Sequence, residues 1–252
     1  MSEADTRSLD SKYALITGAA RRIGAAIAAC LHQAGANVAI HYRSSAGDAK
    51  ELCNRLNDAR PESARIFAAD LSETAGLAGF VDAVIEWGGR LDILVNNASS
   101  FFATPIGKIS ERQWDDLISS NLKAPLFLSQ TAWPYLRSRH GVIINMVDIH
   151  SRRPLRDHAV YVSAKAGLAM LTRALARDMA PEVRVNAIAP GAILWPEEGM
   201  TGTVKQNIVK KIPLGRPGNP DDVAHGVLYL VRDASYVTGQ IISVDGGRSI
   251  GW

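Results

Sequence analysis

Short apolar segments alternate with longer helical patterns along nearly the whole chain, and this alternation constrains the fold more than any other feature. Seven segments rich in apolar and β-branched residues predict strands: Tyr13–Thr17, Val38–Tyr42, Arg65–Ala68, Ile93–Val95, Val142–Val147, Val183–Ile188 and Ile241–Val244. They are near-continuous apolar runs, which is typical of parallel strands buried on both faces.

The stretches between these strands predict helices over Ile23–Ala34, Ala46–Arg60, Ser72–Trp87, Glu111–Arg139, Ala159–Ala180 and Pro220–Val231. Such alternation is typical of an α/β fold in which right-handed crossovers join parallel strands. We therefore expect one Rossmann-type, doubly wound parallel sheet of about seven strands over residues 11–252, with helices on both faces. A flexible tail is expected at residues 1–10, and a substrate loop at about 191–211.

Composition excludes several classes of function. The formal net charge is only +3, from 28 basic and 25 acidic residues, which is too small for a nucleic-acid-binding surface. No run of about 18 apolar residues predicts a membrane span. The first ten residues are polar and do not resemble a signal peptide, so we expect a cytoplasmic protein. Cys30 and Cys53 are expected to be small core residues, and no bound metal is expected.

A glycine-rich turn, Thr17-Gly18-Ala19-Ala20-Arg21-Arg22-Ile23-Gly24, follows the first predicted strand and opens the first helix. Small residues there let the backbone approach a pyrophosphate, whose charge the helix N-terminus favours. A turn without a ligand is the alternative, but the position in the first strand–helix unit favours nucleotide binding. We expect Gly18, Arg22, Ile23 and Gly24 to contact the nucleotide.

The end of the second strand reads Ile40-His41-Tyr42-Arg43-Ser44 and lacks the carboxylate that usually holds the ribose 2′-hydroxyl of NAD. Arg43 and Arg22 would attract a 2′-phosphate, to which Ser44 would donate a hydrogen bond, so NADPH is favoured over a merely solvated turn. Further cofactor positions follow the third and fourth strands: Asp70 and Leu71, then Asn97, Ala98 and Ser99. The Asn97 amide either fixes a helix or lines the cofactor, with a plain turn as the alternative.

Tyr161 and Lys165 are spaced to share one helix face, thirteen and seventeen residues after Asp148. The ammonium of Lys165 is expected to lower the pKa of Tyr161 and so make the phenol a better proton donor. Asp148 follows the fifth strand, at the edge where ligands bind an open α/β sheet. Asn121, in the preceding helix, is expected to hold a water that relays protons to Lys165.

Together these motifs resemble the short-chain dehydrogenase/reductase family over essentially the whole length. The matching features are Thr17-Gly18-x-x-x-Arg22-x-Gly24, Asn96-Asn97-Ala98, Asn121, Tyr161-x-x-x-Lys165, Pro190-Gly191 and Asp245-Gly246-Gly247. Within that family the chain is most similar to pteridine reductases, through Arg22, His41-Tyr42-Arg43-Ser44, Asn97-Ala98-Ser99-Ser100-Phe101, and Asp148 in place of the usual Ser. The resemblance implies NADPH contacted also by Pro190 and Gly191, a homotetramer, and reduction of pterins.

The resemblance also places substrate-binding residues. Phe101 is expected to stack on the pterin unless it is a core residue, and Ser99 to bond the pterin or a cofactor phosphate. Tyr161 and Asp148 would protonate the ring by two routes, one for each C=N bond. Trp195 either closes over the substrate or packs beneath the loop. His150, Arg152 and Arg153, near Asp148, either bind a substrate tail or face solvent, which is the commoner fate of arginine.

Two other functions compete with pterin reduction. The first is a carbonyl reductase of the same fold that acts on a ketone or a 3-oxoacyl thioester. Loss of the usual Ser at position 148 argues against it. The second is a non-enzymatic NADP(H) sensor. The intact Tyr161 and Lys165 argue against a sensor, because it needs no proton donor.

Overall fold

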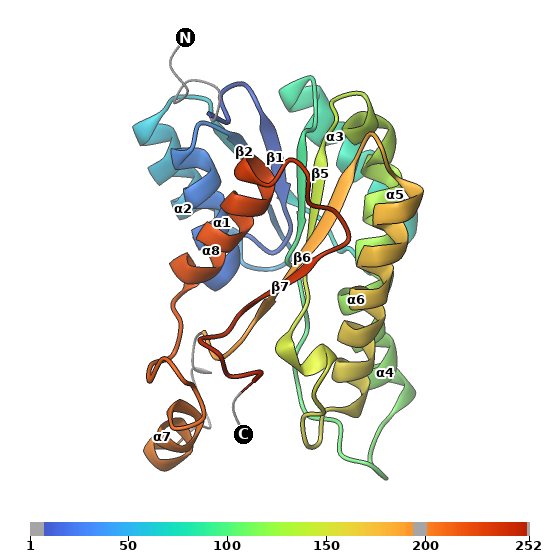
Figure 1. Ribbon diagram of the computed structural model, residues 1–252. Coiled ribbons are helices and arrows are strands. Elements are labelled where there is room, and N and C mark those ends of the chain that lie inside the picture. Colours follow the sequence, from blue (N-terminus) through green and yellow to red (C-terminus); the bar gives the residue numbers. More distant parts are fainter. Residues whose placement is uncertain (1–7, 194–200, 251–252) are drawn as a thin grey trace.

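Seven parallel strands form one sheet in the computed structural model, which describes residues 8–193 and 201–250 (Figure 1). The strands are β1 Tyr13–Ile16, β2 Asn37–Tyr42, β3 Ala64–Ala68, β4 Ile93–Asn96, β5 Val142–Met146, β6 Arg184–Pro190 and β7 Ile241–Val244. Their order across the sheet is β3-β2-β1-β4-β5-β6-β7, and every neighbouring pair is parallel. The predicted fold class is confirmed.

Helices cover both faces of this sheet. One layer consists of α1 Arg22–Gln33, α2 Ala46–Ala59 and α8 Pro220–Leu228, and the other of α3 Leu77–Gly88, α5 Ala124–Arg137 and α6 Ala159–Asp178 (Figure 1). Alternate strand residues serve the two layers: Ile16 packs toward α1 and α8, whereas Leu15 packs toward α3 and α5. Because both strand faces are buried, the strands read as continuous apolar runs.

Three predicted helices differ in detail from the structure. The helix expected from Ser72 begins with a 3-10 turn, Thr74–Gly76, because the Ser72 N–H and hydroxyl both donate to the Asp70 carboxylate and hold a turn there. The long helix expected over Glu111–Arg139 is divided into α4 Glu111–Ile118, a short π-helix Ser119–Lys123, and α5. A second short π-helix, Tyr229–Asp233, extends α8.

Two segments at the margins of the predicted domain also differ. A helix, α7 Gly202–Val209, lies within the stretch expected to be a loop. None of its residues is buried, and its apolar residues, Val204, Ile208 and Val209, are too few for periodicity to mark a helix. Trp195 lies outside the described residues. Within the expected N-terminal tail, Leu9 is buried and its N–H donates to the Ala34 carbonyl.

The carboxyl ends of the strands meet at one edge of the sheet, at the bottom of Figure 1, where α4 and α7 extend past it. All six crossovers leave the strands at this edge. Side chains that follow different strands are therefore brought together there. Among the described helices, none is long and apolar enough to cross a lipid bilayer.

Candidate active site

A cleft of about 1610 Å³ opens at the carboxyl edge of the sheet. A single small-molecule site occupies roughly 300–1,000 Å³, so this cleft has room for a dinucleotide and a second molecule. The sequence-predicted residues that line it are Gly18, Arg22, Ile23, Gly24, His41, Tyr42, Arg43, Ser44, Asp70, Leu71, Asn97, Ala98, Ser99, Phe101, Asp148, Tyr161, Lys165, Pro190 and Gly191. Of the predicted site residues in the described part of the chain, only Asn121 does not line it.

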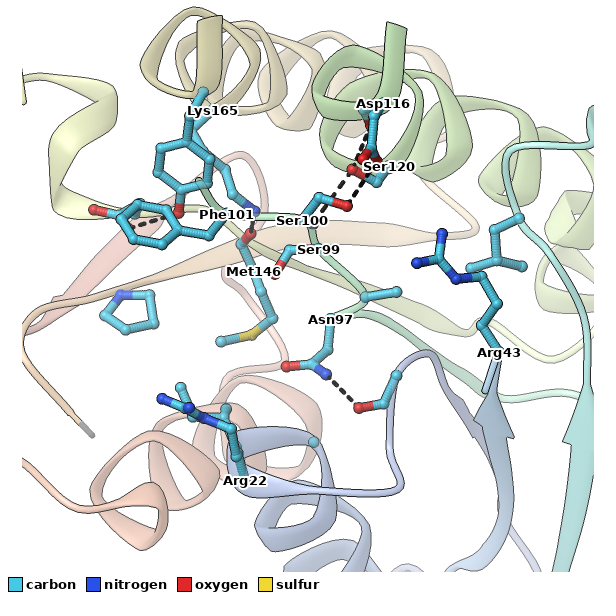
Figure 2. A pocket seen from close by; sticks show the side chains of 18 of the residues that line it. Arg22, Arg43, Asn97, Ser99, Ser100, Phe101, Asp116, Ser120, Met146 and Lys165 are labelled. Carbon is cyan, nitrogen blue, oxygen red and sulfur yellow. Dashed lines mark hydrogen bonds between the residues drawn. The ribbon is translucent and has the colours of Figure 1, made fainter. Parts of the chain in front are cut away.

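The glycine-rich turn is held in place by side chains from the fourth strand. The Thr17 hydroxyl accepts hydrogen bonds from the backbone N–H groups of Asn97 and Ala98, each at 2.9 Å. The Asn97 amide donates to the carbonyls of Thr17 at 2.9 Å and Gly18 at 3.1 Å (Figure 2). Asn97 thus fixes the glycine-rich turn and not a helix, and it also lines the cleft.

His41 also holds the glycine-rich turn in place, through hydrogen bonds of its imidazole ring. Its Nδ1 accepts the Gly18 N–H at 3.0 Å, so the proton sits on Nε2, which donates to the Ala69 carbonyl at 3.1 Å. Burial lowers the pKa of His41, which favours the neutral imidazole that this pair of bonds requires. His41 thus lines the cleft as a brace for the backbone around Gly18.

Two arginines enter the cleft from neighbouring loops. Arg22, at the start of α1, and Arg43, after β2, both line it (Figure 2). Arg22 has a φ of 54°, the conformation for which related turns use glycine. The Asp48 carboxylate is held by Arg21 at 2.7 Å. Arg22 and Arg43 therefore leave a net positive charge at this end of the cleft.

Asp70 and Leu71 complete this region, which we call the nucleotide end and define by Gly18, Arg22, Arg43, Asp70 and Asn97. Hydrogen bonds from the Ser72 hydroxyl and N–H lower the pKa of Asp70 and keep its carboxylate ionised. An ionised carboxylate at this position can accept a hydrogen bond from an amino group of a bound base.

Tyr161, Asp148 and Lys165 meet at the other end of the cleft. The Tyr161 hydroxyl, in a side chain that is only 5% exposed, donates to Asp148 Oδ2 at 2.8 Å. Asp148 Oδ1 accepts the His150 N–H, also at 2.8 Å. Lys165 Nζ donates to the Met146 carbonyl at 2.7 Å and lies 5.8 Å from the centre of the Tyr161 ring. We call this region the substrate end.

The expected effect of Lys165 on Tyr161 is wrong in this structure. Burial, together with the charge and hydrogen bond of Asp148, raises the pKa of Tyr161 instead of lowering it. The reason is geometric: the carboxylate contacts the phenol directly, whereas the ammonium is bonded to a backbone carbonyl. Burial also lowers the pKa of Lys165 to about 8, against the opposing effect of Asp148.

Phe101 is an exposed wall of the substrate end and not a core residue. Its side chain is 54% exposed, it stacks on His158 at 4.8 Å, and it meets the Tyr161 ring edge-on at 4.8 Å. The neighbouring Ser99 is also exposed and lines the cleft (Figure 2). A planar ligand can therefore stack on Phe101 while Tyr161 reaches its edge.

Asn121 and Asp116 secure the segment that carries Ser99 and Phe101. Asn121, fully buried in the short π-helix after α4, donates through Nδ2 to the Ser100 carbonyl at 2.9 Å. The Ser100 hydroxyl donates to Asp116 Oδ1 at 2.8 Å (Figure 2). Asn121 thus positions the wall of the cleft from behind. Its expected water relay to Lys165 stays a prediction.

Arg248 is a cleft residue that sequence reasoning missed. It follows β7 and the glycines at 246 and 247, and it lines the cleft near Asp148. Burial lowers the pKa of Arg248, and the charges of Asp148 and Asp245 oppose that effect. Its place after the last strand, at the ligand-binding edge, is the signal that would have found it. His158 also lines the cleft and was not predicted, because its role depends on stacking against Phe101, which the sequence does not reveal.

The juxtaposed Tyr161 and Lys165, beside a braced glycine-rich turn, agree with a comparison of the whole chain with known families. A family profile described as enoyl-(acyl carrier protein) reductase matches residues 18–249. This chain belongs to the short-chain dehydrogenase/reductase family. It is thus an oxidoreductase, and members of the family use nicotinamide cofactors.

Individual relatives of this short-chain dehydrogenase/reductase carry different activities. It is 37% identical to pteridine reductase 1 of Leishmania tarentolae, over 97% of this chain and 99% of that protein. It is 36% identical to the 3-oxoacyl-[acyl-carrier-protein] reductase FabG of Staphylococcus aureus, over 94% of this chain and 98% of that protein. A solved Sinorhizobium meliloti structure, assigned to the short-chain alcohol dehydrogenases, is 33% identical, covers 98% of this chain and all of its own, and has a TM-score of 0.93.

Proposed function

We propose that this protein is a cytoplasmic, homotetrameric pteridine reductase that uses NADPH to convert a dihydropterin to a tetrahydropterin. The observation that carries the proposal is the bond between the Tyr161 hydroxyl and the Asp148 carboxylate. In this family a Ser usually stands at that position and donates to a ketone oxygen. A carboxylate there suits a substrate whose reacting atom is a ring nitrogen that must be protonated. The 37% identity to a pteridine reductase supports the same conclusion.

The nucleotide end fits NADPH. A side chain at Gly18 would press against the backbone of Ala98, and the positive φ there also favours glycine. The compact turn would let the backbone at the start of α1 approach a pyrophosphate. Arg22, Arg43 and Ser44 would hold the 2′-phosphate that distinguishes NADPH from NADH. Lys165 would hold the nicotinamide ribose. When bound, NADPH supplies the hydride.

The substrate end would supply the protons. Hydride addition to the carbon of a C=N bond leaves an electron pair on nitrogen, and this nitrogen then takes up one proton. We assign two routes, one through Tyr161 for formation of the 7,8-dihydropterin and one through Asp148, protonated or through a water, for the 5,6 bond of a dihydropterin. Phe101 would stack on the ring. Fully oxidised pterins and dihydrofolate contain the same C=N bonds and would be reduced in the same way.

A second candidate is an NADPH-dependent carbonyl or 3-oxoacyl thioester reductase, which the 36% identity to FabG favours. The charge at position 148 opposes it. Reduction of a ketone builds negative charge on oxygen, and the Ser that usually donates a hydrogen bond to that oxygen is replaced by an acidic side chain at position 148. A non-enzymatic NADP(H) sensor is disfavoured, because the cleft brings a proton donor and an ammonium together.

The test follows NADPH oxidation with 7,8-dihydrobiopterin, dihydrofolate and an acetoacetyl thioester, for the wild type, Asp148→Asn and Asp148→Ser. We expect pterin turnover to fall about 100-fold in Asp148→Asn, the size typical of a lost general acid or base. The Kd for NADPH should change less than about 2-fold, because Asp148 lies at the other end of the cleft. Asp148→Ser should gain thioester reduction.

Turnover of the thioester alone by the wild type would assign the chain to the carbonyl reductases. Unchanged pterin turnover in Asp148→Asn would remove Asp148 from the mechanism. Tight NADPH binding with no turnover of any of these substrates would favour the sensor.

A further inference from the structure

Two partly buried arginines in this protein have opposite surroundings. Burial lowers the pKa of both Arg184 and Arg248. Arg184 donates to three backbone carbonyls, those of Leu230 at 2.8 Å, Val231 at 3.1 Å and Val237 at 3.4 Å. The Arg248 guanidinium has no hydrogen bond or ion pair with any described residue. Arg184 is therefore a structural residue, whereas Arg248 has donors left for a ligand.

The acidic neighbours of Arg248 are engaged elsewhere. The Asp245 carboxylate accepts the backbone N–H groups of Gly247 at 3.0 Å and Ser249 at 2.6 Å. The Asp148 carboxylate accepts from Tyr161 and from the backbone of His150. These two charges attract the guanidinium without bonding to it.

A guanidinium keeps its charge when it is buried, because its intrinsic pKa is too high for it to deprotonate. A partly desolvated cation without an acceptor is costly, and an incoming anion removes that cost. The planar fork of arginine matches a carboxylate or a phosphate with two parallel hydrogen bonds. Arg248 thus has the chemistry of an anion-binding residue on the wall of a cleft.

The anion would belong to the side chain of the substrate and not to its reacting ring. Tyr161 already contacts both Asp148 and Phe101 where the ring must react. We propose that Arg248 is a specificity-determining residue that binds an anionic group, a carboxylate or a phosphate, on the substituent of a pterin. This inference rests on the proposed pterin reduction and narrows it to pterins with an acidic side chain.

A matched pair of substrates tests the proposal: 7,8-dihydroneopterin and its 3′-phosphate, which differ only in the anion, with 7,8-dihydrofolate as the carboxylate case. In Arg248→Gln the KM for the anionic substrate should rise about 10- to 100-fold, as expected for a lost charge-assisted pair. Its kcat, and the KM for neutral dihydroneopterin, should change less than about 2-fold. Arg248→Lys should restore part of the affinity, because it keeps the charge and loses the fork.

The matched control is Arg152→Gln, which removes the same charge from an exposed side chain outside the cleft lining. It should leave the preference for the anionic substrate in place. If Arg248→Gln raises the KM for the neopterin phosphate, the recognised group is a phosphate. If it raises the KM for dihydrofolate, the recognised group is a carboxylate. A wild type with equal KM for both neopterins, or an Arg248→Gln variant that raises both KM values equally, overturns the role of Arg248 and leaves pterin reduction standing. No turnover of any pterin overturns both.

Discussion

The two ends of the cleft are built in different ways. At the nucleotide end, buried polar groups bond to one another and to the backbone: Thr17, Asn97 and His41 together hold the turn around Gly18. At the substrate end, one side-chain hydrogen bond joins Tyr161 to Asp148, and the remaining walls are exposed or partly exposed side chains such as Phe101 and Arg248.

This difference explains why relatives with nearly the same identity carry different names. A turn held by a network of buried bonds tolerates few substitutions, because each one leaves another group unpaired. The walls of the substrate end take part in few such bonds, so a few substitutions there alter specificity without disturbing the fold.

The largest expected effect is at the substrate end. Tyr161→Phe removes the proton donor assigned to 7,8-dihydropterin formation and should lower turnover of a fully oxidised pterin by about 10²- to 10⁴-fold. The Kd for NADPH, measured by fluorescence titration, should change less than about 2-fold. Tyr135→Phe is the control, since the Tyr135 hydroxyl bonds to Asp82 outside the cleft. Equal losses in turnover and NADPH affinity would show that the two ends do not act independently.

The reverse pattern is expected at the nucleotide end. Arg43→Gln should reduce the preference for NADPH over NADH by about 10- to 100-fold, through loss of a charge-assisted contact with the 2′-phosphate. The kcat at saturating cofactor should change less than about 2-fold. Steady-state kinetics with both cofactors measure this, with Arg55→Gln as a control on an exposed position of α2. A preference that survives in Arg43→Gln would contradict the assignment of Arg43 to the phosphate.

A pH profile probes the coupling within the substrate end. The Lys165 ammonium, with a pKa of about 8, is needed to hold the ribose, so kcat/KM should fall as the pH rises through about 8. The Asp148 charge raises the pKa of Lys165, and Asp148→Asn should therefore move this decline to lower pH. The measurement is kcat/KM of the wild type and of the residual activity of Asp148→Asn between pH 6 and pH 10, roughly the range that brackets this pKa. A decline at the same pH in both proteins would separate Lys165 from Asp148.

The smallest effect on chemistry, and a clear effect on stability, is expected from His41. In His41→Ala the Gly18 N–H and the Ala69 carbonyl lose their partner, which should lower the free energy of unfolding by about 1–3 kcal/mol. Urea denaturation measures this, with His225→Ala on the exposed side of α8 as the control. Turnover at saturating NADPH should change only a few-fold, as roughly expected for a brace that touches no reacting atom.

The same variant has a predicted pH dependence. The folded-state pKa of His41 lies below the ordinary value of 6.5, so the unfolded state binds more protons as the solution is acidified. The contribution of His41 to stability is therefore present above pH 6.5 and is lost as the pH falls toward and through the lowered folded-state pKa. Unfolding curves of the wild type should show this loss, and His41→Ala should show less of it. Parallel curves would exclude His41 as its source.

Much of the architecture could be predicted because its signals lie within single segments. Continuous apolar runs marked all seven strands, and the glycine-rich turn was found by its position after β1. Helix α7 was missed because its few apolar residues, Val204, Ile208 and Val209, do not form a long periodic face. Arg248 was missed because its only signal is its place after the last strand, and its position in the cleft depends on how that strand packs.

The sequence by itself determined the parallel sheet, the nucleotide-binding turn and the pairing of Tyr161 with Lys165, since each depends on spacings along one stretch of chain. Only the tertiary structure decided that Asp148 accepts a hydrogen bond from the Tyr161 hydroxyl, that Lys165 bonds to the Met146 carbonyl, and that the Arg248 guanidinium lines the cleft with no partner among the described residues. The physical reason is that pKa values and ligand contacts depend on distances between groups on separate strands and helices. Those distances are set by how the strands and helices pack, and spacing along the chain does not reveal them.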